Sequence, residues 1–106
     1  MSEKVLQVNF KYSLPTEELI KATSESADAI ASKPGLRWKI WCHNDETHEA
    51  GGLYLFADEA SADAYTEWVT EQLKGMPVSD ITVRKFDINE DATAITRGPV
   101  STRVSS

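Results

Sequence analysis

Both histidines of the chain lie within one stretch, which runs from Lys39 to Phe56 and reads KIWCHNDETHEAGGLYLF. His48 and Glu49 are neighbours in it, and each could accept a proton in catalysis. His48 is the better candidate for this role, because an unperturbed imidazole titrates near neutral pH. Neighbouring strand residues point to opposite sides, so both could face one pocket only if Gly51 and Gly52 permitted a bulge. The competing interpretation is a hairpin histidine that bonds only backbone or solvent.

The same stretch could instead hold a metal, since His43, Asp45, Glu46, His48 and Glu49 are all potential ligands. A four-residue connection would place the two histidines opposite each other, but a zinc site takes three or four protein ligands. We therefore expect no metal site. The Gly-Gly pair opens a strand, whereas phosphate-binding loops lead from a strand into a helix, so a phosphate site is not expected either.

Aromatic and amide side chains near this stretch could form a binding pocket. Trp38, Trp41 and Tyr54 offer flat apolar walls with polar tips, which suit stacking on a planar ring. Asn9 and Gln7 could point into the same space as amide donors. Aromatic residues of a sheet usually only pack against one another, and an exposed strand face would carry the same amides, so both interpretations stay open.

The elements that must position these residues follow from the spacing of apolar side chains. Residues 5–12 alternate, with Leu6, Val8, Phe10 and Tyr12 on one side, which predicts a strand. Apolar residues then recur at helical spacing, which predicts a helix. It begins near Thr16, a possible N-cap, and ends at the Pro-Gly pair of residues 34–35.

The remainder of the chain predicts a hairpin, a helix and a last strand. Residues 36–43 alternate, the connection NDET follows, and the next strand is AGGLYLF. A second helix extends from Asp58, a strong N-cap candidate, to Gly75. Residues 80–88 form the last strand, and the Ser-rich segment after it loses its apolar content. We divide the chain into one domain, residues 1–95, and a tail, residues 96–106, that could contact a partner subunit.

The order strand, helix, strand, strand, helix, strand predicts an α+β, ferredoxin-like βαββαβ fold. Right-handed crossovers place both helices on one face of a four-stranded antiparallel sheet. The other face is too apolar for water, because Leu53 and Leu55 lie opposite Tyr54 and Phe56 on one strand. We therefore expect a homodimer that closes sheet against sheet into a dimeric α+β barrel. The alternative is a monomer that tolerates a few apolar surface residues.

Composition narrows the class of partner. The net charge of -6, with no block of basic residues, disfavours nucleic acid. No apolar run approaches the roughly 20 residues of a membrane span, and no secretory signal is visible, so we expect a cytoplasmic protein that binds no membrane. Cys42 is the single cysteine and is expected to be a space-filling residue. A small aromatic or hydrophobic molecule remains the expected ligand.

The segments GLRWKIW and THEAGGLYLF resemble those of the YdhR family of monooxygenases, which belongs to the dimeric α+β barrel superfamily of antibiotic-biosynthesis-type monooxygenases. The resemblance extends over most of the chain, from about Val5 to Ile95. The matching positions are Gly35, Trp38, Lys39, Trp41, His48, Glu49, Ala50, Gly51, Gly52, Tyr54, Phe56, Phe86, Asp87 and Asn89.

The resemblance implies a cofactor-independent monooxygenase that acts on a small quinol- or anthrone-like compound. Such an enzyme needs a dry pocket, a proton acceptor and donors for developing negative charge. Some superfamily relatives degrade haem with a histidine on a helix, but the second predicted helix here has none, so haem is not expected. The alternative function is a non-catalytic dimeric barrel that binds a hydrophobic ligand or serves a structural or stress-related role.

Overall fold

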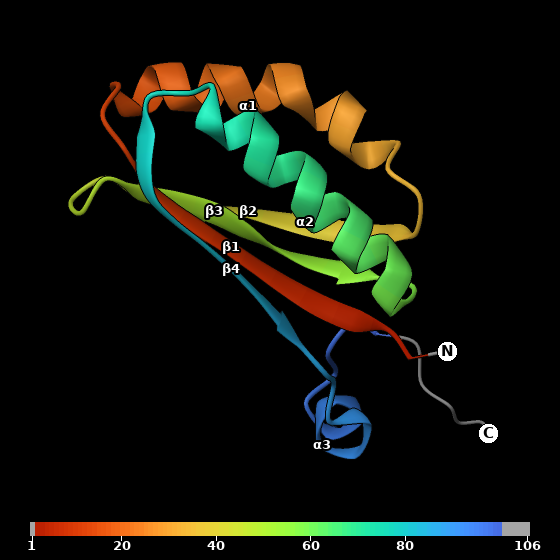
Figure 1. The fold of residues 1–106 in the computed structure, drawn as a ribbon. Coiled ribbons are helices and arrows are strands. Elements are labelled where there is room, and N and C mark those ends of the chain that lie inside the picture. The colour runs from red at the N-terminus through yellow and green to blue at the C-terminus, as the bar shows by residue number, and fades with distance from the viewer. Residues whose placement is uncertain (1, 101–106) are drawn as a thin grey trace.

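The computed structural model of the chain describes residues 2–100. Figure 1 shows one sheet, two long helices across one of its faces, and a short third helix on the opposite side. All neighbouring strands are antiparallel, in the order β2-β3-β1-β4, so the predicted ferredoxin-like fold is confirmed. The elements are β1 (Lys4–Tyr12), α1 (Thr16–Ala31), β2 (Leu36–Asn44), β3 (Glu49–Phe56), α2 (Glu59–Lys74), β4 (Val78–Phe86) and α3 (Glu90–Ile95).

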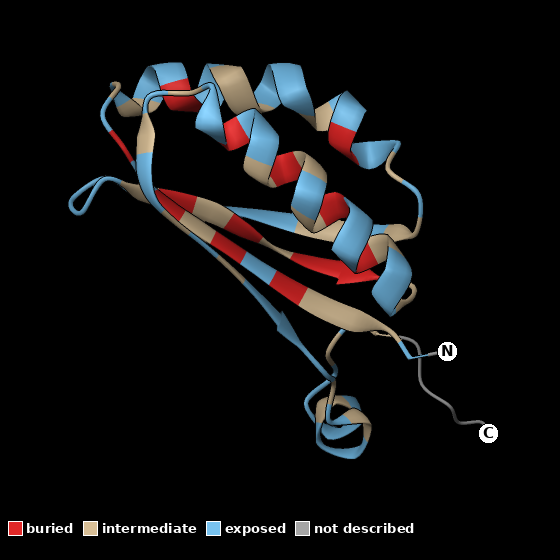
Figure 2. Cartoon of the chain, viewed as in Figure 1, coloured by how far each residue is buried: buried red, intermediate tan, exposed pale blue. Residues whose placement is uncertain are grey.

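The core lies between the sheet and α2. Alternate residues of β1 and β3 face the helices. Leu6 pairs with Tyr54 and Phe10 pairs with Ala50, and all four side chains are buried on the same side of the two central strands. Figure 2 shows these buried positions on the central strands, opposite a buried stripe on α2. Burying side chains of this size contributes about 1.5–3 kcal/mol each, which explains why this face of the sheet is the covered one. The buried residues of α2 are Ala62, Tyr65, Val69 and Leu73.

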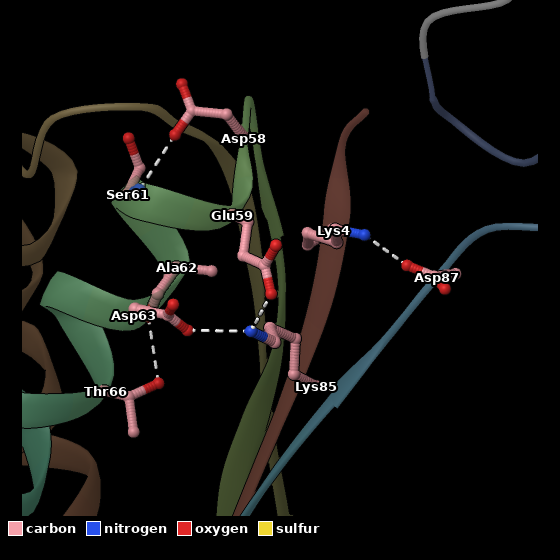
Figure 3. A network of polar contacts seen from close by, with 9 residues as sticks. All are labelled: Lys4, Asp58, Glu59, Ser61, Ala62, Asp63, Thr66, Lys85 and Asp87. Carbon is pink, nitrogen blue, oxygen red and sulfur yellow. Dashed lines mark hydrogen bonds and ion pairs between the residues drawn. The ribbon is translucent and has the colours of Figure 1, made fainter. Parts of the chain in front are cut away.

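Polar contacts fix α2 on the sheet. Its N-cap is Asp58, as predicted, and the Asp58 carboxylate accepts a hydrogen bond of 2.8 Å from the backbone of Ser61. Lys85 of β4 reaches back to the first two turns of the helix, where its Nζ lies 2.5 Å from Glu59 and 2.9 Å from Asp63 (Figure 3). These contacts hold the helix that supplies Tyr65 to the interior.

The helix α1 packs less closely than α2, since only Leu19 and Ile30 of its sixteen residues are buried. Its predicted N-cap is wrong by one residue: Pro15 occupies the cap and Thr16 is the first helical residue. The Thr16 hydroxyl is 2.7 Å from the Tyr12 hydroxyl, so it bonds β1 instead of the helix backbone.

Three features differ from the sequence prediction. The last strand begins at Val78 and ends at Phe86, with Asp80 at a φ of 55° beside a register shift against β1. A shift in β2 also lies between Leu36 and Trp38, so Leu36 packs on the core while Trp38 faces the other way. The segment after the last strand, for which no helix was predicted, contains α3, whose N-cap Asn89 accepts a hydrogen bond from the backbone N–H of Ala92.

The open face of the sheet, opposite α1 and α2, carries exposed apolar residues on its edge strands. Ile40 of β2 is 50% exposed and Phe86 of β4 is 47% exposed. Beyond α3 the chain returns to this face, where Trp38 donates a hydrogen bond of 2.6 Å to the carbonyl of Pro99. The homodimer stays a prediction, and the tail beyond residue 100 lies outside the described residues. In residues 2–100 no helix combines the length and apolar character needed to cross a bilayer.

Candidate functional site

A cavity of about 150 Å³ lies between the sheet and the two long helices. The sheet supplies Phe10 from β1, Lys39 and Trp41 from β2, and Tyr54 from β3. Trp41 is 39% exposed although it lines the cavity, which places it where the cavity meets solvent. The helices supply the opposite wall, from α1 through Leu19, Ile20, Thr23 and Ile30 and from α2 through Tyr65, Trp68, Val69 and Leu73.

Aromatic rings form the wall shared by β3 and α2. The Tyr65 ring centroid is 4.9 Å from that of Tyr54, 5.2 Å from that of Phe56 and 5.6 Å from that of Trp68. Inclined rings at these separations attract one another through their quadrupoles in addition to the area they bury. The cavity therefore has a rigid aromatic wall against which a planar ligand could stack.

The hydroxyls of Tyr54 and Tyr65 are buried and lie 3.0 Å apart. Burial raises the pKa of Tyr54 above the ordinary phenol range and raises the pKa of Tyr65 to about 12, so both are uncharged at neutral pH. Their mutual hydrogen bond uses one of the two hydroxyl protons. The pair therefore keeps one proton that it can donate to a third group.

Lys39 brings an amine into this apolar cavity. Its Nζ lies 3.2 Å from the ring centroid of Trp41 and 4.6 Å from that of Tyr54. Within residues 2–100, no carboxylate oxygen lies within 4 Å of this amine. Burial lowers the pKa of Lys39 from 10.5 to about 7, although the nearby Cys42 acts in the opposite direction.

The relative sizes of two effects decide the charge of Lys39. A lowering of the pKa from 10.5 to about 7 corresponds to a desolvation cost on the order of 5 kcal/mol for the ammonium. Two cation–π contacts at a partly exposed site return about 2 kcal/mol. Desolvation is the larger effect, so the pKa of Lys39 stays below that of an ordinary lysine and its uncharged fraction near neutral pH is correspondingly larger.

Gly52 makes room for the Lys39 side chain. A Cβ at Gly52 would lie 2.7 Å from Cε of Lys39 and 2.9 Å from the carbonyl oxygen of Ile40. Real Cβ atoms do not approach other heavy atoms this closely, so any other residue would displace the lysine or the backbone of β2. The second glycine of the HEAGG segment therefore serves to seat Lys39 across β3.

The structure brings together two of the four predicted binding residues. Trp41 and Tyr54 line the cavity, whereas Trp38 and Asn9 lie on the open face. Asn9, with Gln7 and Glu49, lines a second, shallower hollow of about 220 Å³ on that face. A binding role for Trp38 and Asn9 stays a prediction. A ligand that contacts them would have to bind on the open face.

The predicted catalytic pair lies at the hairpin between β2 and β3. His48 belongs to the turn, at a φ of 56°, and its ring stacks on Tyr12 with centroids 5.0 Å apart. Glu49 begins β3 and accepts a hydrogen bond of 2.9 Å from the Thr47 hydroxyl. Neither is among the residues that line the cavity between sheet and helices. A catalytic role for His48 or Glu49 stays a prediction.

The expected pairing of the two histidines is wrong. The register joins His43 to Ala50, because His48 lies in the turn and not on the strand. His43 instead approaches Asp45, at 3.6 Å between Nε2 and Oδ1. Over residues 2–100, no group of three or more His, Cys, Asp or Glu side chains is placed to hold a metal ion.

Sequence reasoning missed Lys39 and Tyr65 as site residues. The alternation of side chains along β2 could have identified Lys39, because it puts Lys39 on the same side of the strand as Trp41. Since Tyr54 pairs with Lys39 across the two strands, that side is the one the helices cover. A lysine on a covered face is unusual enough to mark a functional position.

Comparison with known proteins gives one result at the level of the family. A family model described as "Putative mono-oxygenase ydhR" matches residues 5–99. The match covers every element of the sheet, both long helices and α3. No curated protein matches the chain significantly.

Proposed function

Because the chain belongs to the ydhR family, we propose that it is a monooxygenase of a small, single-ring phenol or quinol, which it binds in the cavity between the sheet and the helices. The observation that carries this proposal is the position of the Lys39 amine inside an aromatic cavity, where burial lowers its pKa to about 7. The cavity supplies the dry pocket, Lys39 the proton acceptor, and the tyrosine pair a hydrogen-bond donor.

The size of the cavity favours one ring over three. A closed apolar cavity of about 150 Å³ in another protein accommodates benzene, and this cavity has the same volume. A single-ring quinol therefore fits without rearrangement, whereas a three-ring anthrone would require α1 to move outward. Among the two substrate types that the family resemblance implies, we propose the quinol type.

Lys39 accepts the phenolic proton of the bound substrate in the first step. A free phenol has a pKa close to 10, so transfer to an amine of pKa about 7 is unfavourable in isolation. Burial disfavours both charges, but the attraction between ammonium and phenolate in a low dielectric raises the pKa of the amine and lowers that of the phenol, and the tyrosine pair donates a hydrogen bond to the phenolate. The pair thus produces the anion that reacts with oxygen.

The phenolate supplies all the electrons for the reaction, so the proposed chemistry requires no cofactor. It transfers one electron to O₂, and the resulting radical pair joins through a new C–O bond to give a ring hydroperoxide. The O–O bond then breaks as the carbon loses its proton, which yields a quinone carbonyl and one water. One oxygen atom enters the product and the other leaves as water, as hydroquinone plus O₂ giving hydroxybenzoquinone plus water illustrates.

Oxygen uptake with isotope labelling tests this function. Purified protein, treated with a metal chelator, is incubated with phenol, hydroquinone or anthrone under ¹⁸O₂, and uptake above the buffer rate is recorded. The proposal predicts one ¹⁸O atom per molecule of quinone product. Uptake without label in the product would indicate simple oxidation, and no uptake above buffer would favour the non-catalytic binding module.

Two variants separate the candidate bases. Lys39→Met should lower kcat/KM by a factor of about 100 or more, which is typical for the loss of a general base. His48→Ala should leave turnover within about threefold of the unmodified chain, because His48 lies outside the cavity. The opposite pattern would assign the proton transfer to His48.

We also propose that two chains pair through their open faces. The support is the exposure of Ile40 and Phe86 at the two edges of that face, where solvated side chains would normally be polar. Sedimentation at micromolar concentration should give twice the mass of one chain, and Ile40→Glu should shift the species toward the monomer. A single-chain mass for the unmodified protein would contradict this assembly.

A further inference from the structure

The amine of Lys39 has a chemical property that the proposed oxygenation does not use. An uncharged primary amine is a nucleophile as well as a base, and lysines desolvated in apolar pockets form Schiff bases with carbonyl compounds. Lys39 meets the geometric requirements, since it lines a cavity and no hydrogen bond from its Nζ is present among the described residues. Its neighbours at Nζ are the faces of two rings.

We infer that the cavity is a carbonyl-binding site in which Nζ of Lys39 forms a Schiff base with a small aromatic aldehyde. The inference goes beyond the oxygenation proposed above and does not rest on it. The amine lone pair attacks the carbonyl carbon, and a C–N bond forms as the C–O double bond becomes a hydroxyl. One nitrogen proton moves to the former carbonyl oxygen and makes it that hydroxyl. The Tyr54–Tyr65 pair donates a proton as the hydroxyl leaves as water, the second nitrogen proton returns to the pair, and a C=N bond remains.

The aromatic walls favour an aromatic aldehyde over an aliphatic or charged one. A planar ring can stack between Trp41 at the cavity mouth and the Tyr54–Tyr65 wall, with a volume that matches about 150 Å³. A carboxylated aldehyde would have to be desolvated beside an uncharged amine, which is unfavourable. The hydroxyl pair lines the same cavity and retains a proton for the departing oxygen.

The groups that face Lys39 do not hold it in the charged form. The sheet contributes Tyr54, Cys42 and His43 to the cavity lining, α2 contributes Tyr65, and α1 contributes no titratable side chain. The lining contains no carboxylate. Cys42 is the one neighbour whose charge favours the ammonium, and burial outweighs it.

Reductive trapping tests the inference. The full chain is incubated at pH 7.5 with limiting benzaldehyde and sodium cyanoborohydride, which reduces the C=N bond to a stable benzylamine. Peptide mapping by mass spectrometry then gives the labelled fraction of each lysine. Lys33 is the internal reference, because its Nζ also lies on a tryptophan ring, 3.8 Å from the centroid of Trp68, but outside the cavity lining.

Lys39 should be labelled at least about ten times faster than Lys33, because an amine with a pKa near 7 has far more free base at pH 7.5 than an ordinary lysine. Saturating toluene, a neutral competitor for the cavity, should suppress labelling at Lys39 and leave Lys33 unchanged. Equal labelling of the two lysines, or labelling of Lys39 that toluene does not affect, would overturn the inference. Because both readouts use the unmodified chain, neither depends on whether a Lys39 variant folds.

The outcome is independent of the oxygenation assay. Oxygen incorporation without preferential labelling of Lys39 would leave the proposed function intact and remove the Schiff-base site. Preferential labelling without oxygen uptake would establish the carbonyl site in a chain that is not an oxygenase.

Discussion

Replacing Lys39 with methionine should stabilise the chain in a way that depends on pH. Methionine has a similar length and no charge, so Lys39→Met removes the cost of holding an ammonium in the cavity and leaves most of the packing. In the unmodified chain, burial lowers the pKa of this lysine from 10.5 to about 7. The unfolded chain therefore binds more protons than the folded chain between these two pH values.

The sign of the effect follows from this difference in bound protons. The free energy of unfolding of the unmodified chain should rise as the pH increases from about 7 to 10.5, and the full cost of the buried ammonium applies below pH 7. The pH-dependent part of the free energy of unfolding is on the order of 5 kcal/mol if it is taken from the lowered pKa alone. It is about 3 kcal/mol if the cation–π contacts offset part of the desolvation cost of the ammonium. The variant lacks this dependence.

Urea unfolding followed by circular dichroism measures the prediction, at fixed protein concentration and at intervals from pH 6 to pH 10. The stability advantage of Lys39→Met should shrink by about 2–4 kcal/mol across this range. Lys33→Met is the matched control, since Lys33 also contacts a tryptophan ring but does not itself line the cavity, and its replacement should shift stability by one small, constant amount. Parallel curves for Lys39→Met and the unmodified chain would refute the assignment of a desolvated amine.

Four further outcomes follow from the same site and from the open face. Tyr54→Phe or Tyr65→Phe alone should cost about 1–3 kcal/mol of stability by orphaning a buried hydroxyl, while the double variant should cost less than their sum. Gly52→Ala should destabilise the fold by about 1–3 kcal/mol in urea unfolding and lower oxygen uptake, because its Cβ would displace Lys39. For the unmodified chain, kcat/KM of the proposed oxygenation should rise through about pH 7 as Lys39 becomes uncharged, and a flat profile would argue against this base. In sedimentation, Ile40→Glu should yield the monomer while Lys21→Glu, an exposed position of α1 on the other side of the sheet, should not.

The fold could be predicted from the sequence because its elements carry strong local signals. The alternation of β1 corresponds to an unbroken row of covered side chains, and Asp58 forms the helix cap that its type and position indicate. The errors occur where tertiary contacts override local preference. Thr16 bonds to Tyr12 instead of capping α1, and a bulge at Arg37 puts Leu36 and Trp38 on opposite faces.

The candidate site was predictable only in part. The aromatic residues Trp41 and Tyr54 were recognisable as residues that could line a pocket, but no sequence pattern decides which face of the sheet forms a cavity. That decision depends on how far α1 stands from the sheet, which no local pattern encodes. The histidines attracted attention by residue type, whereas Lys39 is an ordinary lysine until its surroundings remove water from it.

The ionisation of Lys39 is the most direct test of this account. Its ¹³Cε and ¹⁵Nζ chemical shifts can be followed by NMR from pH 5 to pH 11, with Lys39→Arg used to assign the signal. We predict a midpoint near 7 in the free protein and a higher midpoint when a phenol occupies the cavity. A midpoint near 10, unaffected by phenol, would contradict it.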